Sequence, residues 1–232
     1  IDKIIASQTN YSRKDVKKLI SQKKVRVNDE IVKRPEQKFD EQQDTIYIDE
    51  NKLDMKKHIY LVLNKPQGYI SATEDRTAKT VLDLVPEQYK RKGLFPAGRL
   101  DKDTTGMMII TDDGEFAHNI LAPRKHIEKT YRVQIDIDIT EEMKEKFKQG
   151  IVLKDHVCCP ATIIVEDKNT ALITITEGKY HQIKRMFGCF GAKVVNLHRI
   201  SMGGLQLPGD LKEGQCRELT TEELEKVCKR DK

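Results

Sequence analysis

The sequence contains no tryptophan, and aromatic residues make up only 6% of its 232 residues. No apolar stretch approaches the roughly 18 residues that a membrane-spanning helix needs, and no signal-peptide pattern opens the chain. These absences argue against a membrane protein and against a secreted one. The chain is long enough for two modest domains or one large domain. We expect it to act in the cytoplasm without a membrane partner.

Cysteine is present without any recognisable pairing pattern. The five cysteines are Cys158, Cys159, Cys189, Cys216 and Cys228. Their odd number and the lack of a Cys-x-x-Cys pair argue against a disulfide framework and favour reduced thiols in a cytosol. The histidines show no His-Glu-x-x-His or Cys/His metal spacing, and the chain has neither a Gly-x-Gly-x-x-Gly motif nor a P-loop. The sequence therefore predicts no metal site and no small-molecule cofactor.

Charged residues are abundant, at 34% of the chain, but they are unevenly placed. Residues 1–38 hold 11 Lys and Arg against 5 Asp and Glu, whereas the remainder holds 31 against 32. The basic surplus behind the net charge of +5 therefore lies at the start of the chain. A polyanion would meet this segment first.

The basic segment has the pattern of two helices followed by small strands. Ser12 with Asp15 three residues later predicts a capping box at the start of a helix over residues 13–22. A hairpin is predicted around Asn28 and Asp29, and residues 45–48 form a further strand. The exposed face of the 13–22 helix carries Arg13, Lys14, Lys17 and Lys18. A solvated helix face and a nucleic-acid contact explain this charge pattern equally well.

The rest of the chain is dominated by predicted strands that are joined by hairpins and long connections. Helices are interspersed irregularly, including one over 141–149 that Thr140 caps and one over 179–190. The second would place His181 and Lys184 on one face, one turn apart. This order predicts an α+β fold with a mainly antiparallel sheet rather than a regular βαβ alternation.

The stretch most informative about function is FPAGRLDKDTTGMMIITDDG, residues 95–114. A glycine-containing entry, a charged turn and a buried strand together present one side chain at the rim of a cleft, and the candidate is Asp101. Asp101 and Asp103 could simply be turn residues that hydrogen-bond their own backbone. A calcium loop is excluded, because Asp112 replaces the bidentate Glu at its twelfth position. The third interpretation is a catalytic carboxylate.

The motifs GRLDKDTTG and MIITDDG resemble the signature of bacterial ribosomal RNA pseudouridine synthases, and most of all the small-subunit (16S) RsuA type. Three further blocks follow in the order typical of that family: AHNILAPRKHIEKTYRV (117–133), EGKYHQIKRMFGCFGAKVVNLHR (177–199) and GGLQLPGDLKEGQCRELTTEE (203–223). Two basic helices and small strands at the start resemble the S4-type RNA-binding module. The resemblance implies an S4-like domain over 1–50, a linker over 51–58 and a catalytic domain over 59–232, whose large sheet is bisected by a cleft.

The resemblance also implies roles for individual residues. Asp101 aligns with the catalytic Asp, and Lys184 with the basic residue of the third motif; its neighbour Arg185 is the rival for pairing with Asp101. Tyr131 matches the Lys-x-Tyr motif, whose ring stacks on the flipped uracil, although a core strand Tyr is the commoner use. Arg99 matches the Arg of the GRLD block, which in relatives helps to occupy the space left by the flipped nucleotide. His181 and Gln182 are expected to orient the RNA or the backbone rather than to act in catalysis.

We therefore expect a cofactor-independent enzyme that isomerises a uridine of 16S ribosomal RNA, either naked or in a small-subunit assembly particle, and acts as a monomer. The closest alternative is a large-subunit (23S) RNA synthase of the same superfamily. An alternative of another class is a non-catalytic RNA-binding assembly factor with an idle cleft. Joint retention of Asp101, Tyr131 and Lys184 argues against the last.

Overall fold

A computed structural model describes residues 1–40 and 43–229. They form two compact units. The first comprises Ile1–Ile59 together with Val85–Leu94, and the second comprises Tyr60–Leu84 together with the described residues from Phe95 onward. No helix in the described ranges combines the length and apolar character needed to cross a membrane.

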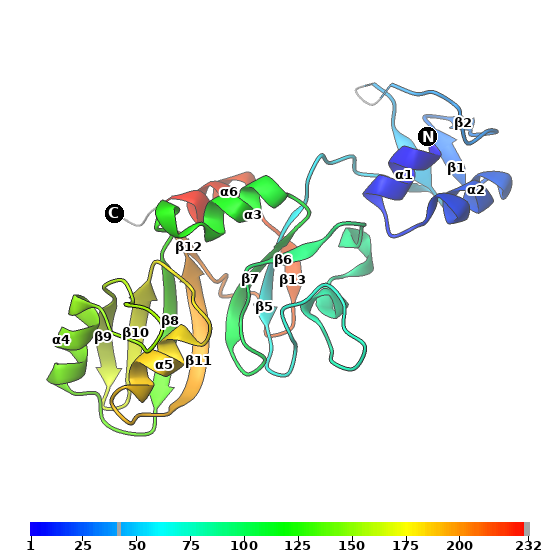
Figure 1. Ribbon diagram of the computed structural model, residues 1–232. Helices are drawn as coiled ribbons and strands as arrows, with labels where there is room; N and C mark the ends of the chain where they lie inside the picture. Colours follow the sequence, from blue (N-terminus) through cyan, green and yellow to red (C-terminus); the bar gives the residue numbers. More distant parts are fainter. Residues whose placement is uncertain (41–42, 230–232) are drawn as a thin grey trace. The chain divides into compact units, whose positions relative to one another are not determined.

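The first unit packs two helices against a small sheet (Figure 1). The helices are α1 (Asp2–Gln8) and α2 (Arg13–Ser21). The strands are β1 (Val25–Val27), β2 (Glu30–Ile31), β3 (Ile46–Ile48) and β4 (Asn51–Lys52), in the order β2-β1-β3-β4. The short 3₁₀ helix η2 (Glu87–Tyr89) belongs to the same unit. Ile5, Val16, Ile20, Val25 and Ile46 form its apolar core.

Local sequence signals predict this unit well. Ser12 accepts a hydrogen bond from the backbone N–H of Asp15, and the Asp15 carboxylate accepts one from the N–H of Ser12, so the predicted capping box is confirmed. β1 and β2 form the predicted hairpin. β4 lies within the segment 51–58 that the sequence suggested as a linker.

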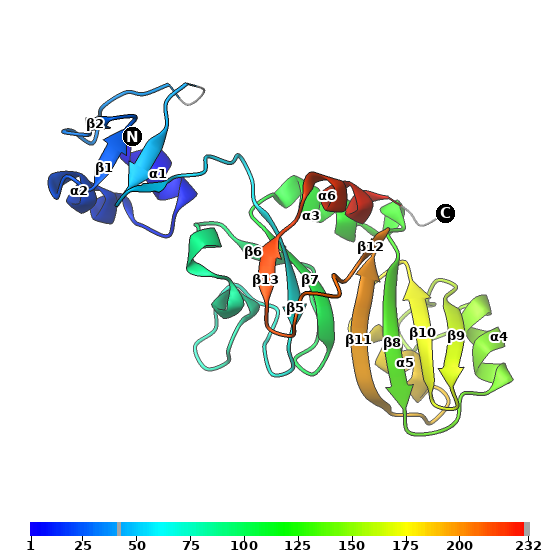
Figure 2. The ribbon, with the colours of Figure 1, turned by 180° about the vertical axis from the view of Figure 1, so that it is seen from behind.

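The second unit is built on a nine-stranded sheet with the path β13-β5-β7-β11-β8-β10-β9, to which β6 adds beside β7 and β12 beside β11 (Figure 2). Every pairing is antiparallel except that of β7 with β11, which joins His198 to Thr105 and Arg199 to Gly106 in parallel. This confirms the α+β class with a mainly antiparallel sheet. The strands are β5 (Tyr60–Lys65), β6 (Phe95–Ala97), β7 (Thr105–Thr111), β8 (Lys129–Ile135), β9 (Thr162–Asp167), β10 (Thr170–Ile175), β11 (Val194–Met202), β12 (Leu205–Gln206) and β13 (Cys216–Glu218).

Helices cover this sheet in two groups, both visible in Figures 1 and 2. α3 (Gly114–Leu121) and α6 (Thr221–Cys228) lie side by side, whereas α5 (Gln182–Gly188) lies over β8 and β11 and α4 (Glu141–Gln149) lies beside β9. Short 3₁₀ helices are η1 (Val81–Leu84) and η3 (Pro123–Lys125). The predicted start of α4 is confirmed, because the side chain of Thr140 accepts a hydrogen bond from the first turn of that helix, and Thr220 caps α6 in the same way.

Gly106 marks the junction of β7 with β11. Its φ of +99° lies in a region that side-chain-bearing residues rarely adopt, and a Cβ there would lie 2.3 Å from the carbonyl oxygen of Arg199. Only glycine allows the two backbones to approach this closely. Thr105 and Gly106, which follow the turn that carries Asp101, are thus already part of β7.

Two further element boundaries differ from the predictions. The helix expected over 179–190 is wrong at both ends, because α5 spans Gln182–Gly188. His181 has left-handed backbone angles (φ +48°) and ends the preceding turn instead of continuing a helix. After α5, strand β11 continues to Met202, since pairing with β8 extends along its length.

Candidate active site

Asp101 lies in the turn between β6 and β7, which a buried serine fixes in place. The hydroxyl of Ser71 donates to the carbonyl of Leu100 at 2.7 Å and accepts from its N–H at 2.9 Å. The N–H of Thr104 closes the turn on the carbonyl of Asp101 at 3.1 Å. Leu100 is buried, whereas the Asp101 side chain is 27% exposed. The backbone therefore anchors the turn and leaves the carboxylate accessible.

Lys65, at the end of β5, binds the backbone of the same turn. Its side chain is fully buried, and its ammonium group donates to the carbonyls of Thr104 at 2.7 Å, Pro66 at 3.1 Å and Lys102 at 3.3 Å. Burial lowers the pKa of Lys65 to about 8, although the negative charges of Asp103 and Asp101 favour its charged form. A buried cation thus binds the backbone on both sides of Asp103.

Lys184, on α5, is the cation that faces Asp101. Its ammonium nitrogen lies 3.0 Å from Oδ2 of Asp101 and 2.6 Å from Oδ1 of Asp103. Burial acts to lower the pKa of Lys184, but hydrogen bonds to Asp103 and Asp101 outweigh it and raise that pKa above its ordinary value. The hydrogen bond from Lys184 holds the pKa of Asp103 below its usual range. One lysine therefore binds two carboxylates.

His181 approaches the second oxygen of Asp101. Its Nε2 lies 3.4 Å from Oδ1, a distance too long for a strong hydrogen bond. The imidazole is stacked on the ring of Tyr180, with centroids 3.9 Å apart and planes inclined by 16°. Tyr180 is 76% exposed. Stacking thus positions the exposed ring of Tyr180 against His181, which contacts Asp101.

Gln182 and Arg185 turn away from Asp101 toward their own protein neighbours. The Gln182 amide donates to the buried carboxylate of Glu177 at 2.8 Å, and its oxygen accepts from the N–H of Lys179 at 2.9 Å. Arg185 is paired with the carboxylate of Asp155. Lys184, and not Arg185, is therefore the partner of Asp101 in the structure, and Gln182 shapes the backbone before α5.

A pocket of about 60 Å³ opens beside Asp101. Tyr131 on β8 is 7% exposed and contributes to its wall, and Arg99 lines it from the turn. The guanidinium of the buried Arg199 lies 5.9 Å from the centroid of the Tyr131 ring and donates to the carbonyl of Met107 at 2.6 Å. The fold thus brings together Asp101, Arg99, Tyr131, His181 and Lys184 around one opening.

A second, larger groove of about 780 Å³ is lined by Asp103, Arg132, Gln134, His198 and Glu213, among others. Arg132 and Gln134 alternate with Tyr131 along β8 and so project from the opposite face of the sheet. This groove carries both signs of charge and does not contain Asp101. We place the candidate site in the smaller pocket because Asp101, Tyr131 and Lys184 line it.

The four basic residues on α2 are all exposed, but they are not equivalent. Arg13 forms a two-oxygen ion pair with the buried carboxylate of Asp2, with nitrogen–oxygen distances of 2.9 to 3.2 Å. That contact fixes α2 to α1. Lys14, Lys17 and Lys18 project from the same helix as solvated cations, so they form the larger part of the basic face.

Sequence reasoning missed three residues of this site. Lys65 follows an apolar strand and precedes a proline, which resembles an ordinary solvated strand end, and only the distant turn at Lys102–Thr104 buries it. Tyr180 gave a weak signal, as an aromatic residue next to the His-Gln pair. Arg199 gave none, because its burial depends on the pairing of β11 with β7.

Comparisons with known proteins identify relatives of this chain. The sequence profile described as RNA pseudouridylate synthase matches residues 59–188, and the S4 domain profile matches residues 1–46. Ribosomal small subunit pseudouridine synthase A of Escherichia coli K12 is 41% identical over 231 residues, covering 98% of this chain and 99% of that protein. An uncharacterised RNA pseudouridine synthase of Bacillus subtilis is 39% identical over 229 residues, covering 97% and 96%. A crystal structure of a pseudouridylate synthase, 38% identical, superposes with a TM-score of 0.70 over 97% of this chain and 98% of that chain.

Proposed function

Because this chain belongs to the RNA pseudouridylate synthase family and is a pseudouridine synthase with an N-terminal S4 domain, we propose that it isomerises a uridine of 16S ribosomal RNA with Asp101 as the catalytic carboxylate. The observation that carries the assignment of Asp101 is its contact with Lys184 in a pocket that Tyr131 also lines. Relatives named as small-subunit synthases over nearly the full length support the 16S substrate.

The reaction requires an anionic group next to the sugar and base. The C1′–N1 bond breaks and a C1′–C5 bond forms, while N1 gains a proton and C5 loses one. Every atom of the base except these protons stays in the product, so the exchange consumes no oxidant and no group donor. A carboxylate can serve as nucleophile or as acid–base for these steps, and Asp101 is the carboxylate that faces the pocket.

Lys184 and His181 give the two oxygens of Asp101 different environments. Lys184 places a positive charge beside Oδ2, and the attraction between the two charges strengthens when a bound base shields the site from water. Among the described residues, the contact at Oδ1 is the long one with His181. Substrate can displace that contact at little cost, so we assign Oδ1 as the reacting oxygen.

Aromatic rings lie where an extruded nucleotide and its neighbour would need them. An enzyme that acts on a base within RNA unstacks it and offers stacking partners in exchange. Tyr131 lines the pocket and is held by the buried Arg199, so it is suited to stack on the target uracil. Tyr180 is exposed and stacked on His181, so it is suited to receive an adjacent base. Arg99 at the rim can contact the phosphate or fill the vacated space.

The S4 domain would hold the RNA without taking part in the chemistry. Lys14, Lys17 and Lys18 are exposed on one helix, and such a surface tracks phosphates without reading sequence. Specificity for one uridine then arises jointly from this tether and from the shape of the pocket. The RNA could be naked or part of an assembling small subunit.

A pseudouridine map of ribosomal RNA, made from cells with and without this protein, tests the proposal. We expect one pseudouridine in 16S RNA to depend on the protein and on Asp101. Loss of a 23S pseudouridine instead would reject the 16S substrate but keep the enzyme. Purified full chain should also release tritium from [5-³H]uridine-labelled 16S RNA. A folded protein that releases none from either ribosomal RNA or its assembly particles would overturn the whole assignment.

A further inference from the structure

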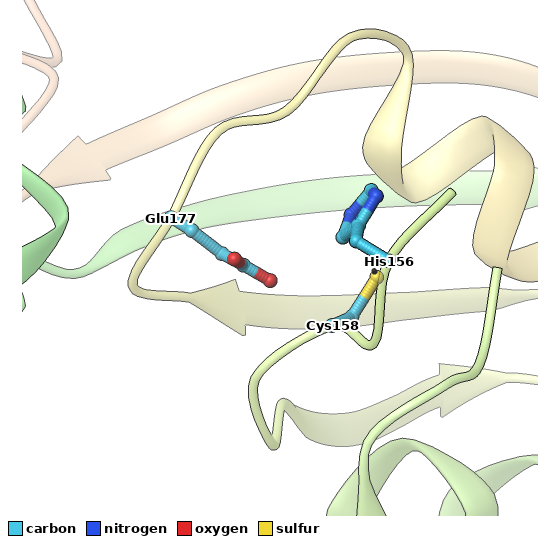
Figure 3. A group of neighbouring side chains, drawn as sticks. All are labelled: His156, Cys158 and Glu177. Carbon is cyan, nitrogen blue, oxygen red and sulfur yellow. Dashed lines mark hydrogen bonds between the residues drawn. The ribbon is translucent and has the colours of Figure 1, made fainter.

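Three side chains with metal-binding atoms converge away from the Asp101 pocket. They are His156, Cys158 and Glu177, and one ligand atom from each lies within 4.8 Å of the other two (Figure 3). Cys158 is 2% exposed and Glu177 is 8% exposed, while His156 is partly buried. Their spacing in the sequence follows no metal-binding motif, and folding alone brings them together.

A tight hairpin positions the first two ligands. Val152 pairs with Val157 in an antiparallel bridge, the N–H of Leu153 donates to His156, and the N–H of Cys158 donates to Ile151. Residues two apart on an extended strand project to the same side, so the imidazole and the thiol face one space. Glu177 enters that space from the segment between β10 and α5 (Figure 3).

The distances suit a tetrahedral ion of the zinc type. Zinc lies about 2.0–2.1 Å from an imidazole nitrogen and about 2.3 Å from a thiolate sulfur, so a tetrahedral angle sets the two ligand atoms about 3.6 Å apart. Nε2 of His156 lies 3.6 Å from Sγ of Cys158. These two atoms already span one edge of such a site, and a carboxylate oxygen of Glu177 lies within 4.8 Å of both.

Surrounding groups orient these ligands as in established metal sites. Nδ1 of His156 lies 3.2 Å from the carboxylate of Asp155, an arrangement that directs Nε2 toward a metal. Oε1 of Glu177 accepts from the N–H of Cys159 and from Gln182, both at 2.8 Å. The carboxylate is therefore held in place with its second oxygen still available. Asp155 also neutralises Arg185, which reduces repulsion of a dication.

We propose that His156, Cys158 and Glu177 form a binding site for a divalent ion of the zinc class, with water as the fourth ligand. Imidazole and thiolate favour zinc and cobalt over magnesium and calcium. The thiol of Cys158 binds as thiolate, and its proton passes to solvent. The inference rests on this cluster and is independent of the proposed RNA substrate.

The site would have a structural consequence for the neighbouring pocket. Glu177 immediately precedes the segment that carries Tyr180, His181 and Lys184. An ion bound to Glu177 and to the 151–158 hairpin would cross-link two loops that are otherwise connected by hydrogen bonds. Such a link would stabilise the folded state and limit motion of the segment that contacts Asp101.

The test uses the full chain, stripped with a chelator and kept reduced, and titrates it with Co²⁺. We expect one Co²⁺ per chain and a near-ultraviolet thiolate-to-cobalt charge-transfer band that Zn²⁺ abolishes by displacement. Zn²⁺ at a hundredfold excess over its Kd should raise the unfolding midpoint by about 5–10 °C. A folded protein that gives no such band and no Zn²⁺-dependent shift would overturn the proposal.

Variants locate the ion. Cys158→Ser should remove the band, whereas Cys159→Ser and Cys189→Ser, which alter exposed thiols, should keep it. Glu177→Gln retains an oxygen that accepts both hydrogen bonds, so it should fold and lose affinity by at least about tenfold. If Cys158→Ser fails to fold, Glu177→Gln decides the question. Unchanged affinity in Glu177→Gln, or a band that depends on Cys159, would reject this site.

Discussion

The ammonium group of Lys184 lies 3.0 Å from Oδ2 of Asp101, although α5 carries the lysine and the turn between β6 and β7 carries the carboxylate. Both side chains are mostly shielded from solvent, with 22% and 27% of their surface exposed. Attraction between the two charges is therefore stronger than at a fully solvated surface. The contact makes the surroundings of the Asp101 carboxylate depend on correct placement of α5.

The first prediction separates the two carboxylates that share Lys184. Asp101→Asn should reduce turnover by more than about 10³-fold, because it removes the reacting charge at nearly constant shape. RNA affinity and the unfolding midpoint should change little. Asp103→Asn should lower turnover by less than about tenfold, since Lys184 keeps Asp101 as its partner. Tritium release under single-turnover conditions measures both. Equal losses would mean that Asp101 is not uniquely catalytic.

The second prediction concerns the cation. Lys184→Met should lower the single-turnover rate by about 10- to 100-fold, the cost of about 1.5–3 kcal/mol for a lost charged hydrogen bond. Lys184→Arg should retain most of the rate because it keeps the charge. Arg185→Met is the matched control, since Arg185 pairs with Asp155 and not with Asp101. A larger loss in Arg185→Met would reverse the assignment.

The contact between Asp101 and Lys184 could be anticipated from the sequence for a definable reason. Asp101 and Lys184 lie in contiguous motifs, so their identities are visible without the fold, as are capping boxes such as that of Ser12 and Asp15. The prediction that His181 and Lys184 share one helix face failed, because a left-handed residue breaks the helix at His181. Both side chains reach Asp101 nonetheless, from the turn and from α5 respectively.

The third prediction follows from the buried Lys65. Burial lowers its folded-state pKa to about 8 from an ordinary 10.5. Between these values the unfolded chain binds more protons than the folded chain, so the contribution of Lys65 to stability rises with pH. From pH 8 to pH 9 the unfolding free energy of the wild type should rise by about 1 kcal/mol more than that of Lys65→Met.

Urea unfolding at the two pH values measures this difference. Comparison with the variant removes effects of other groups, such as Cys216, whose pKa burial raises to about 12 and which opposes the trend. In Lys129→Met the unfolding free energy should also rise less with pH than in the wild type, because burial lowers the pKa of Lys129 to about 8 as well. An equal rise of the unfolding free energy with pH in the wild type and in Lys65→Met would mean that Lys65 is not a buried cation.

The fourth prediction tests Tyr180 as a stacking surface. Tyr180→Ala should raise KM for RNA by roughly 5- to 150-fold, corresponding to about 1–3 kcal/mol for one stacked base. The single-turnover rate at saturating RNA and the unfolding midpoint should change little, because the ring is 76% exposed. Tyr180→Phe keeps the ring and should behave as wild type. An unchanged KM in Tyr180→Ala would exclude the stacking role.

The fifth prediction concerns the S4 domain. Replacing Lys14, Lys17 and Lys18 with Gln should weaken RNA binding and lower the slope of log K against log salt by about two units, if each lysine neutralises a phosphate. Arg13 is left intact because its pair with Asp2 joins α1 to α2. The same replacement of Lys144, Lys146 and Lys148 on α4 is a charge-matched control. Equal effects of both triple variants would indicate a general charge effect without a defined face.

Residues whose environment depends on distant pairing could not be predicted. Lys65 becomes buried only when the turn after Asp101 folds against it, and the His156, Cys158 and Glu177 cluster requires two loops to meet. The end of β11, at Ser201 and Met202, likewise gains its strand character from pairing with Thr130 and Lys129 of β8. Local patterns thus specified element types and the candidate carboxylate, while long-range contacts specified the surroundings.

Because the backbones of β7 and β11 approach closely at Gly106, the geometry of the site depends on how these two strands meet. Asp101 belongs to the β7 side of that junction, whereas Tyr131 and Lys184 belong to the β8–β11 side. A methyl group at residue 106 would collide with the backbone of Arg199 and force the two sides apart. In a mutational survey scored by activity alone, this position would therefore be indistinguishable from the carboxylate that we propose to react, although none of its atoms needs to touch RNA.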